Sequence, residues 1–197
     1  MGLPDISIIT ATTNNKLLLG DCIKSIYENN HDMNLEIIVV DNGSTDGTVE
    51  FIKGQFVDVK FIINERFKGL ACSYNQALSI AKGRYVLILN DDIIVLPDTF
   101  KRMVEYMDAH DKVGLLGCRL INSDGSLQVS SYTDYPSLWT DFLESTLLSL
   151  FIRRLSDNRA SYDMFGRQDN QPNIIKTVKH LMGACIIARR EIIKEVG

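Results

Sequence analysis

Acidic and amide side chains follow two apolar runs of the sequence, at the point where each run ends. Asp41 closes the run at residues 36–40, and the triplet Asn-Asp-Asp at residues 90–92 closes the run at residues 85–89. Both runs are typical of buried parallel strands, and open α/β sheets bind ligands at the carboxyl ends of such strands. Carboxylate oxygens suit Mg²⁺ or Mn²⁺, and such an ion can neutralise a diphosphate. The pattern therefore indicates chemistry on an activated phosphate compound.

Each of these acidic positions also has a purely structural interpretation. Asp41 with Asn42 could form a turn that ends a strand, and Asp91 with Asp92 could only cap a helix. Their joint occurrence after two buried strands favours the functional interpretation. Asp46, the three histidines and the four cysteines lack partners at ligand spacing. We expect Asp46 to cap a helix and the cysteines to pack as small apolar residues.

Composition limits the class of protein but does not select one. The chain has 197 residues and a formal net charge of -4, so it lacks the basic excess that nucleic-acid binding usually requires. We therefore expect no nucleic-acid partner. The cysteines form no Cys-x-x-Cys pair, which indicates reduced thiols and a cytoplasmic setting. No stretch approaches the roughly 18 apolar residues that span a bilayer, so we expect a soluble or peripheral protein.

Apolar runs alternate with segments of helical periodicity, which is typical of βαβ units and a mostly parallel sheet. The expected strands lie at residues 6–9, 36–40, 59–63, 85–89 and 113–116. The expected helices lie at residues 16–28, 70–81 and 97–108, with a short helix that ends near residue 52. Later segments are a turn at 122–126, a helix at 137–155, a polar stretch at 156–173, a strand at 182–188 and a helix from 191. The chain is thus expected to form one α/β domain, with a Rossmann-like nucleotide-binding half at residues 1–120 and an incomplete acceptor-side half at 121–197.

One face of the helix expected at residues 137–155 is aromatic and rich in leucine. Its members are Trp139, Phe142, Leu143, Leu147, Leu150 and Phe151, with Arg153, Arg154 and Arg159 close by. Such a stripe is typical of core packing. The alternative is a helix that lies on an anionic membrane surface, which would place the protein at the inner face of the membrane.

Several motifs of the chain resemble the glycosyltransferases of family 2, which have the GT-A fold. The segment Val-Asp-Asn-Gly-Ser-Thr-Asp-Gly at residues 40–47 resembles the most recognisable motif of that family. Gly-Leu-Ala at residues 69–71 with Asn75, and Leu-Asn-Asp-Asp at residues 89–92, resemble two further motifs, the second being the equivalent of Asp-x-Asp. Blocks at residues 124–128 and 183–185 resemble the rhamnosyltransferase-like branch.

This resemblance implies an inverting transfer of a sugar from a nucleoside-diphosphate sugar to a hydroxyl of a saccharide or lipid-linked acceptor. Thr12 and Asp41 would contact the base and ribose, and Asp91 the ribose or donor sugar. Asp92 would hold a divalent metal, Mn²⁺ or Mg²⁺, with a weaker contribution from Asn90. The other donor-site residues that the resemblance implies are Asn14, Asn42, Ser44, Gly69 and Asn75.

The sequence departs from the family pattern at several positions. Thr13 stands where an aromatic residue is common, Phe67 stands where asparagine is common, and Asn90 replaces the first acid of a literal Asp-x-Asp. The segment that carries the catalytic base in the family would follow Gly197, so we expect the chain to be truncated and the base to lie beyond it. A chain without that base could also be a non-catalytic nucleotide-sugar-binding or scaffold module.

Two other nucleotide-dependent classes lack their motifs here. No Gly-x-Gly-x-x-Gly follows an expected strand, which argues against a dinucleotide-dependent oxidoreductase. The chain also has no Gly-x-x-x-x-Gly-Lys segment, which argues against a P-loop ATPase.

Overall fold

A computed structural model describes residues 2–126, 128, 132–133, 175, 177–178 and 180–196. The helix expected at 137–155, its apolar stripe and the polar stretch at 156–173 lie outside the described residues. The chain forms two compact units, one of Met1–Cys118 with Gly183–Gly197 and one of Arg119–Met182. The segment from residue 183 lies in the first unit, and the division into a nucleotide-binding half and an acceptor-side half at residue 120 stays a prediction.

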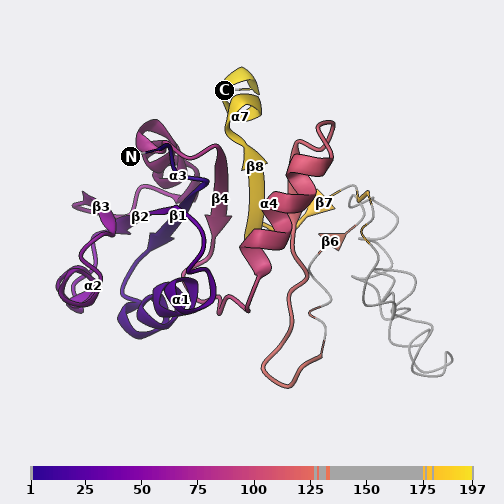
Figure 1. The fold of residues 1–197 in the computed structure, drawn as a ribbon. Coiled ribbons are helices and arrows are strands. Elements are labelled where there is room, and N and C mark those ends of the chain that lie inside the picture. Colours follow the sequence, from indigo (N-terminus) through magenta and orange to yellow (C-terminus); the bar gives the residue numbers. More distant parts are fainter. Residues whose placement is uncertain are drawn as a thin grey trace, which may run out of the picture. The chain divides into compact units, whose positions relative to one another are not determined.

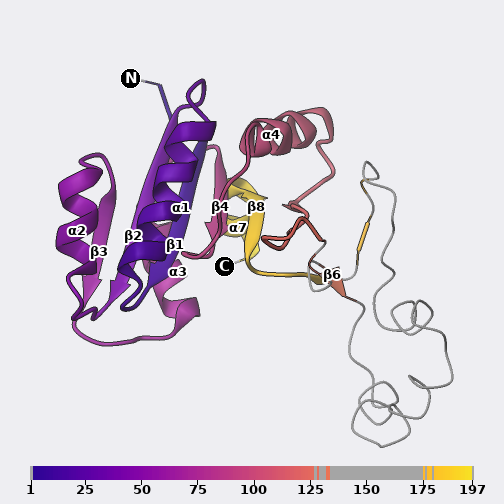
Figure 2. The same cartoon turned by 90° about the horizontal axis from the view of Figure 1, so that it is seen from below.

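The first unit is built on a six-stranded sheet of order β3-β2-β1-β4-β8-β5 (Figure 1). Its strands are β1 (Ile6–Thr12), β2 (Leu35–Asn42), β3 (Lys60–Asn64), β4 (Tyr85–Leu89), β5 (Leu115–Gly117) and β8 (Cys185–Arg189). Figure 2 shows β3, β2, β1 and β4 next to one another, and each pairs in parallel with its neighbour. The late strand β8 is inserted between β4 and β5 and is antiparallel to both. The expected α/β fold with a mostly parallel sheet is confirmed.

Helices connect the strands and cover the sheet. They are α1 (Lys16–Asn29), α2 (Thr48–Gln55), α3 (Leu70–Ile80), α4 (Thr99–Ala109) and α7 (Arg190–Val196). Figure 1 shows α1 and α3 on opposite sides of β1 and β2. Ala77 of α3 and Ala81, which follows the helix, pack in one cluster with residues of the sheet, namely Ile9, Ile38 and Val40. Because helices cover both faces, the parallel strands are apolar along nearly their whole length.

Strand order reverses between β1 and β4, which fixes where a ligand can approach the sheet. Chain progression runs outward from β1 through β2 to β3, and then returns to the other side of β1 to form β4. The helices α1 and α2 therefore lie on one face and α3 on the other, so the carboxyl ends of β1 and β4 form a topological switch point. This topological switch point is where open α/β sheets bind ligands.

A buried polar network holds the opposite, amino-terminal end of the parallel strands. The Ser7 hydroxyl on β1 donates to the Glu36 carboxylate on β2, which also accepts from Lys60 Nζ at 2.5 Å and from the Lys82 backbone N–H at 2.8 Å. Burial raises the pKa of Glu36, but the hydrogen bonds from Lys60, Ser7 and Lys82 outweigh burial and hold the pKa below its ordinary value. A Cβ at Gly83 would lie 2.3 Å from the Ser7 nitrogen, so only glycine fits there.

The described part of the second unit contains a tight turn and a two-stranded sheet. The Asn122 N–H donates to the Ser126 carbonyl at 2.8 Å, and Gly125 has a φ of +82°, as the Asn-Ser-Asp-Gly-Ser segment predicts. Strand β6 (Tyr132–Thr133) pairs antiparallel with β7 (His180–Leu181). The strand expected at 182–188 is observed as β8, which begins at Cys185 in the first unit, and the sequence analysis did not predict β7.

Candidate functional site

The carboxyl ends of β1 and β4 are joined by a hydrogen bond between two of the predicted site residues. The buried Thr12 hydroxyl, at the last position of β1, donates to Asp91 Oδ2 at 2.7 Å. Asp91 lies two residues after the end of β4 and is half-buried. The switch point of the sheet therefore carries a half-buried carboxylate that the Thr12 hydroxyl orients.

Asp41, the penultimate residue of β2, lies beside its register partner Thr12 and is 1% exposed. Its Oδ2 accepts the backbone N–H groups of Gly43 at 3.1 Å and Ser44 at 3.0 Å. Its Oδ1 is buried and has no hydrogen-bond partner among the residues that the structure describes. A buried carboxylate oxygen without a partner costs free energy, so it is a position where a ligand N–H or O–H would be bound favourably.

Two loops are tied together next to Asp41. The Asn14 N–H donates to Ser44 Oγ at 2.8 Å, and the Thr45 N–H donates to Asn14 Oδ1 at 2.7 Å. Asn14 itself has a φ of +51°, a left-handed conformation that asparagine tolerates better than most residues. The β1–α1 and β2–α2 loops, which both carry predicted donor-site residues, are thereby held in one arrangement.

Asn42 takes part in an interior network. Its Oδ1 accepts hydrogen bonds from Asn64 Nδ2 at 3.1 Å and from Ser73 Oγ at 3.0 Å, and the side chain is buried. The amide oxygen of Asn42 thus joins β2 to β3 and α3. The assignment of Asn42 as a donor-site residue stays a prediction. Its observed contacts hold the end of β2, where Asp41 also lies, against β3 and α3.

The start of α3 lies at the same edge of the sheet. Gly69 precedes the helix with a φ of +86°, and no acidic residue occupies the first turn of α3. Free backbone N–H groups at a helix start favour anions such as phosphate. Asn75 lies on the exposed surface of α3.

The triplet after β4 offers oxygen ligands of graded exposure. Asp92 is exposed, whereas Asn90 is half-buried and its backbone N–H donates at 2.9 Å to the carbonyl of Ala184, the residue before β8. No cluster of three or more potential metal-ligand side chains occurs in the part of the chain that the structure describes. Asp91, Asp92 and Asn90 offer carboxylate and amide oxygens, the hard ligands that Mg²⁺ or Mn²⁺ takes from a protein together with substrate phosphates and water.

Two residues near this triplet were not predicted from the sequence. Burial raises the pKa of Tyr74 on α3, and the negative charge of Asp91 raises it further, so the Tyr74 hydroxyl stays neutral. Cys22 on α1 donates to the Asn90 carbonyl at 3.7 Å, and burial beside Asp91 and Asp92 raises the pKa of its thiol to about 12. Neither residue type carries a signal of its own in a helical segment.

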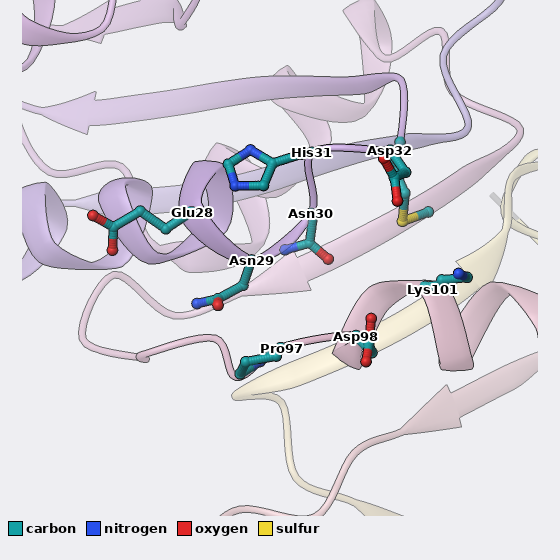
Figure 3. Close-up of a pocket in the computed structure, with 9 residues that line it drawn as sticks. Glu28, Asn29, Asn30, His31, Asp32, Pro97, Asp98 and Lys101 are labelled. Atoms are coloured by element: carbon teal, nitrogen blue, oxygen red, sulfur yellow. The ribbon is translucent and has the colours of Figure 1, made fainter.

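Asp46 and His31 lie outside the proposed ligand contacts. Asp46 Oδ1 accepts the Thr48 N–H at 3.0 Å, so Asp46 bonds the first residue of α2, but the N-cap position expected for it is occupied by Gly47. His31 lines a pocket formed by the end of α1 and the start of α4, with Glu28, Asp32 and Lys101 (Figure 3). The loop from residue 30 to the start of β2 contributes to this pocket, which therefore lies at the amino-terminal end of the parallel strands.

Comparison with known proteins identifies a family. The sequence model described as "Glycosyl transferase family 2" matches residues 7–197. An uncharacterized glycosyltransferase of Methanocaldococcus jannaschii is 36% identical over 120 residues, which are 59% of this chain and 41% of that protein. The GalNAc(5)-diNAcBac-PP-undecaprenol beta-1,3-glucosyltransferase of Campylobacter jejuni is 32% identical over 132 residues, which are 64% of this chain and 41% of that protein. The chain thus spans less than half the length of these two relatives.

Solved structures share the fold. A mannosyltransferase of Pyrobaculum calidifontis, in complex with GDP-Man and Mn²⁺, has a TM-score of 0.63 at 20% identity and covers 100% of this chain and 48% of its own. Staphylococcus aureus TarS in complex with UDP has a TM-score of 0.62 at 20% identity and covers 98% and 48%. The fold is therefore the GT-A fold, as the sequence motifs predict.

Proposed function

The chain belongs to glycosyl transferase family 2, and on that premise we propose that it binds a nucleoside-diphosphate sugar at the carboxyl edge of β1, β2 and β4. The sugar would pass to a hydroxyl of a saccharide or lipid-linked acceptor with inversion at the anomeric carbon. The Campylobacter relative, whose name states an undecaprenol-linked compound, supports an acceptor of this kind. No helix in the described part of the chain is both long and apolar enough to cross a membrane.

The observation that carries this proposal is the pair of carboxylates on either side of Thr12. Asp41 Oδ1 is buried without a partner among the described residues, and Asp91 is fixed through its Oδ2 by the Thr12 hydroxyl. A nucleoside offers donors for both positions, a base N–H for one carboxylate and a ribose hydroxyl for the other. Both acceptors lie at the switch point of the sheet, where open α/β sheets bind ligands, and this supports a nucleotide at that position.

We assign the diphosphate to the space between the start of α3 and the triplet at residues 90–92. Asp92 would hold Mn²⁺ or Mg²⁺, with Asn90 as a weaker neutral ligand. When bound, the ion would stabilise the negative charge of the leaving diphosphate. The Pyrobaculum neighbour, which contains GDP-Man and Mn²⁺, supports a metal of this class. Asp41, Asp91 and Asp92 are all used in this assignment, so it gives the role of catalytic base to none of them.

Isothermal titration calorimetry with UDP and GDP, each with Mn²⁺ or with a chelator, tests the proposal. Asp41→Ala should weaken nucleotide binding both with metal and without it, because it removes the buried acceptor of the base or ribose. Asp32→Ala is the matched control, since Asp32 is an exposed carboxylate in the pocket at the other end of the sheet (Figure 3). Equal affinities of the wild type and both variants for every nucleotide would contradict the donor site.

A transfer assay then separates an enzyme from a binding module. The sugar nucleotide that binds most tightly is incubated with Mn²⁺ and a mixed set of saccharide and lipid-linked acceptors, and the release of nucleoside diphosphate is measured. Acceptor-dependent release that Asp41→Ala abolishes supports sugar transfer. Tight donor binding without any release would instead indicate a non-catalytic module.

A further inference from the structure

Two cysteines far apart in the sequence face each other across the antiparallel strands β5 and β8. The register pairs Leu115 with Ala188, Leu116 with Ile187 and Gly117 with Ile186. One further step along the same register brings Cys118 opposite Cys185. Directly opposite residues in an antiparallel pair lie roughly 4.5–5.5 Å apart at Cα and project to the same face of the sheet. A disulfide needs a Cα separation of roughly 4.4–6.8 Å, so the backbone already has a suitable geometry.

We propose that Cys118 and Cys185 are a site of reversible oxidation by hydroperoxides, which converts the two thiols into a cross-strand disulfide. In the first step the Cys118 thiolate attacks one oxygen of hydrogen peroxide, which gives a sulfenic acid on Cys118 and releases hydroxide. In the second step the Cys185 sulfur attacks the Cys118 sulfur, the S–S bond forms, and the sulfenic oxygen leaves as water. Two electrons pass from the thiols to the peroxide, and the protons of the thiols end in water.

The surroundings of the two thiols assign them different roles in this reaction. Cys118 is half-buried, whereas Cys185 is 4% exposed. A hydrogen bond from the Cys185 thiol lowers the pKa of Cys118, and the same contact together with burial raises the pKa of Cys185. Cys118 is therefore the thiol that reaches peroxide and carries thiolate character, and Cys185 is the thiol that resolves the sulfenic acid.

The other two cysteines have no such partner among the described residues. Cys22 is buried, and its thiol is a poor nucleophile because burial raises its pKa to about 12. Cys72 is exposed on α3. Cys72 thus serves as an internal reference for an accessible thiol without a resolving neighbour.

The position of the pair gives its oxidation a structural consequence. In the sequence the two cysteines flank the second unit, Arg119–Met182, at the points where the chain leaves the first unit and returns to it. A disulfide would therefore close the whole second unit into one covalent loop. Cys185 also follows Ala184, whose carbonyl accepts the Asn90 N–H at 2.9 Å. The disulfide would therefore form at the residue next to the one that is hydrogen-bonded to the triplet at 90–92.

Peptide mapping without reduction tests the proposal directly. The folded chain carrying Cys72→Ser, which removes cross-linking between molecules through the exposed thiol, is treated with an equimolar amount of hydrogen peroxide and then alkylated in denaturant. The expected product is one peptide pair joined through Cys118 and Cys185, two hydrogens lighter than the reduced pair, with Cys22 alkylated. Dithiothreitol should restore both thiols. A chain in which Cys118 and Cys185 are recovered as separately alkylated or overoxidised peptides would overturn the proposal.

Single variants distinguish the two steps. In Cys185→Ser the sulfenic acid on Cys118 has no resolving thiol, so dimedone should label Cys118 after peroxide, whereas Cys118→Ser should leave Cys185 unlabelled. Peroxide should raise the melting temperature of the Cys72→Ser chain and leave that of Cys72→Ser with Cys118→Ser unchanged, because only the former can close the loop. Circular dichroism checks that each variant is folded. Labelling of Cys185 in the absence of Cys118 would reverse the assigned roles, and no labelling of Cys118 in Cys185→Ser would refute them.

Discussion

The Thr12 hydroxyl donates a hydrogen bond of 2.7 Å to Asp91, a residue 79 positions later in the chain. The bond crosses the point where the strand order reverses, from the end of β1 to the loop that follows β4. Thr12 is also the register partner of Asp41 on the neighbouring strand β2. Thr12 thus orients the Asp91 carboxylate and lies beside the Asp41 carboxylate.

Thr12→Val should destabilise the fold and weaken nucleotide binding together. Valine keeps the shape of threonine but leaves Asp91 Oδ2 without its donor, and a hydrogen bond to a charged group contributes roughly 1.5–3 kcal/mol. Asp91 is half-buried, so we expect a loss near the lower end, about 1.5 kcal/mol, by urea unfolding. Thr13→Val is the control, because the exposed Thr13 hydroxyl bonds only to the Thr12 carbonyl at 2.9 Å. Equal stability of the two variants would show that the Thr12–Asp91 bond contributes nothing measurable.

Gly43 and Gly47 provide a matched pair on the loop after β2. Both have a φ of +79°, so alanine at either position carries the cost of a left-handed backbone, about 1 kcal/mol. A Cβ at Gly43 would also lie 2.9 Å from the Glu65 carbonyl oxygen and 3.2 Å from Arg66 Cα, whereas a Cβ at Gly47 meets nothing within 4 Å. We therefore expect Gly43→Ala to lower the unfolding free energy more than Gly47→Ala, and to weaken nucleotide binding because the Asp41 carboxylate accepts the Gly43 N–H. Identical unfolding free energies of Gly43→Ala and Gly47→Ala would mean that the β3–α3 loop shifts without cost to make room for the Cβ at residue 43.

The elements around the site were predictable where local sequence decides the structure. The apolar run at 36–40 leads into Asp41, and the hydrogen bond from the Thr48 N–H to Asp46 follows from the position of Asp46 just before α2. The place of β8 was not predictable, because pairing between Cys185 and Leu89 depends on contacts across nearly half the chain. Likewise, the alternation of side chains along a strand predicts that Asp41 and Asn42 point to opposite faces of the sheet. It does not predict the hydrogen bonds that Asn64 and Ser73 donate to Asn42. Sequence patterns therefore indicated the proposed ligand-binding edge of the sheet better than the hydrogen-bond network around Asn42.

Glu36→Gln should reveal a pH-dependent contribution to stability. The pKa of Glu36 is lowered in the folded chain, so its carboxylate stabilises the fold fully above the unfolded value near 4.5. That contribution is lost as the pH falls from about 4.5 through the lower folded value. The Lys60 partner is 47% exposed, so we expect a modest advantage of the wild type at pH 7, about 2 kcal/mol. Urea unfolding between pH 3 and pH 7 should show this advantage shrinking toward acid pH.

An exposed ion pair provides the control for Glu36. Glu28 lies 3.8 Å from Lys24 on α1, and both side chains are more than half exposed. Glu28→Gln should therefore change the unfolding free energy by no more than about 0.5 kcal/mol at pH 7. A difference between the wild type and Glu36→Gln that stays constant from pH 3 to pH 7 would refute the assignment of a lowered pKa to Glu36.

Asp92→Ala should remove the metal dependence of nucleotide binding without unfolding the chain. Asp92 is exposed, and none of the other described residues donates a hydrogen bond to its carboxylate, so its loss should leave the unfolding free energy within about 0.5 kcal/mol of the wild type. The affinity for UDP or GDP in the presence of Mn²⁺ should fall about tenfold or more, because the ion loses its most accessible carboxylate ligand. In chelator, the wild type and the variant should bind nucleotide equally, whereas Asp41→Ala should be weaker under both conditions. The distinction lies in the geometry of the two carboxylates: Asp41 is buried beside the base position, and Asp92 faces solvent where the phosphates would lie. Calorimetry in which Mn²⁺ strengthens binding to Asp92→Ala as much as to the wild type would exclude Asp92 as the metal ligand.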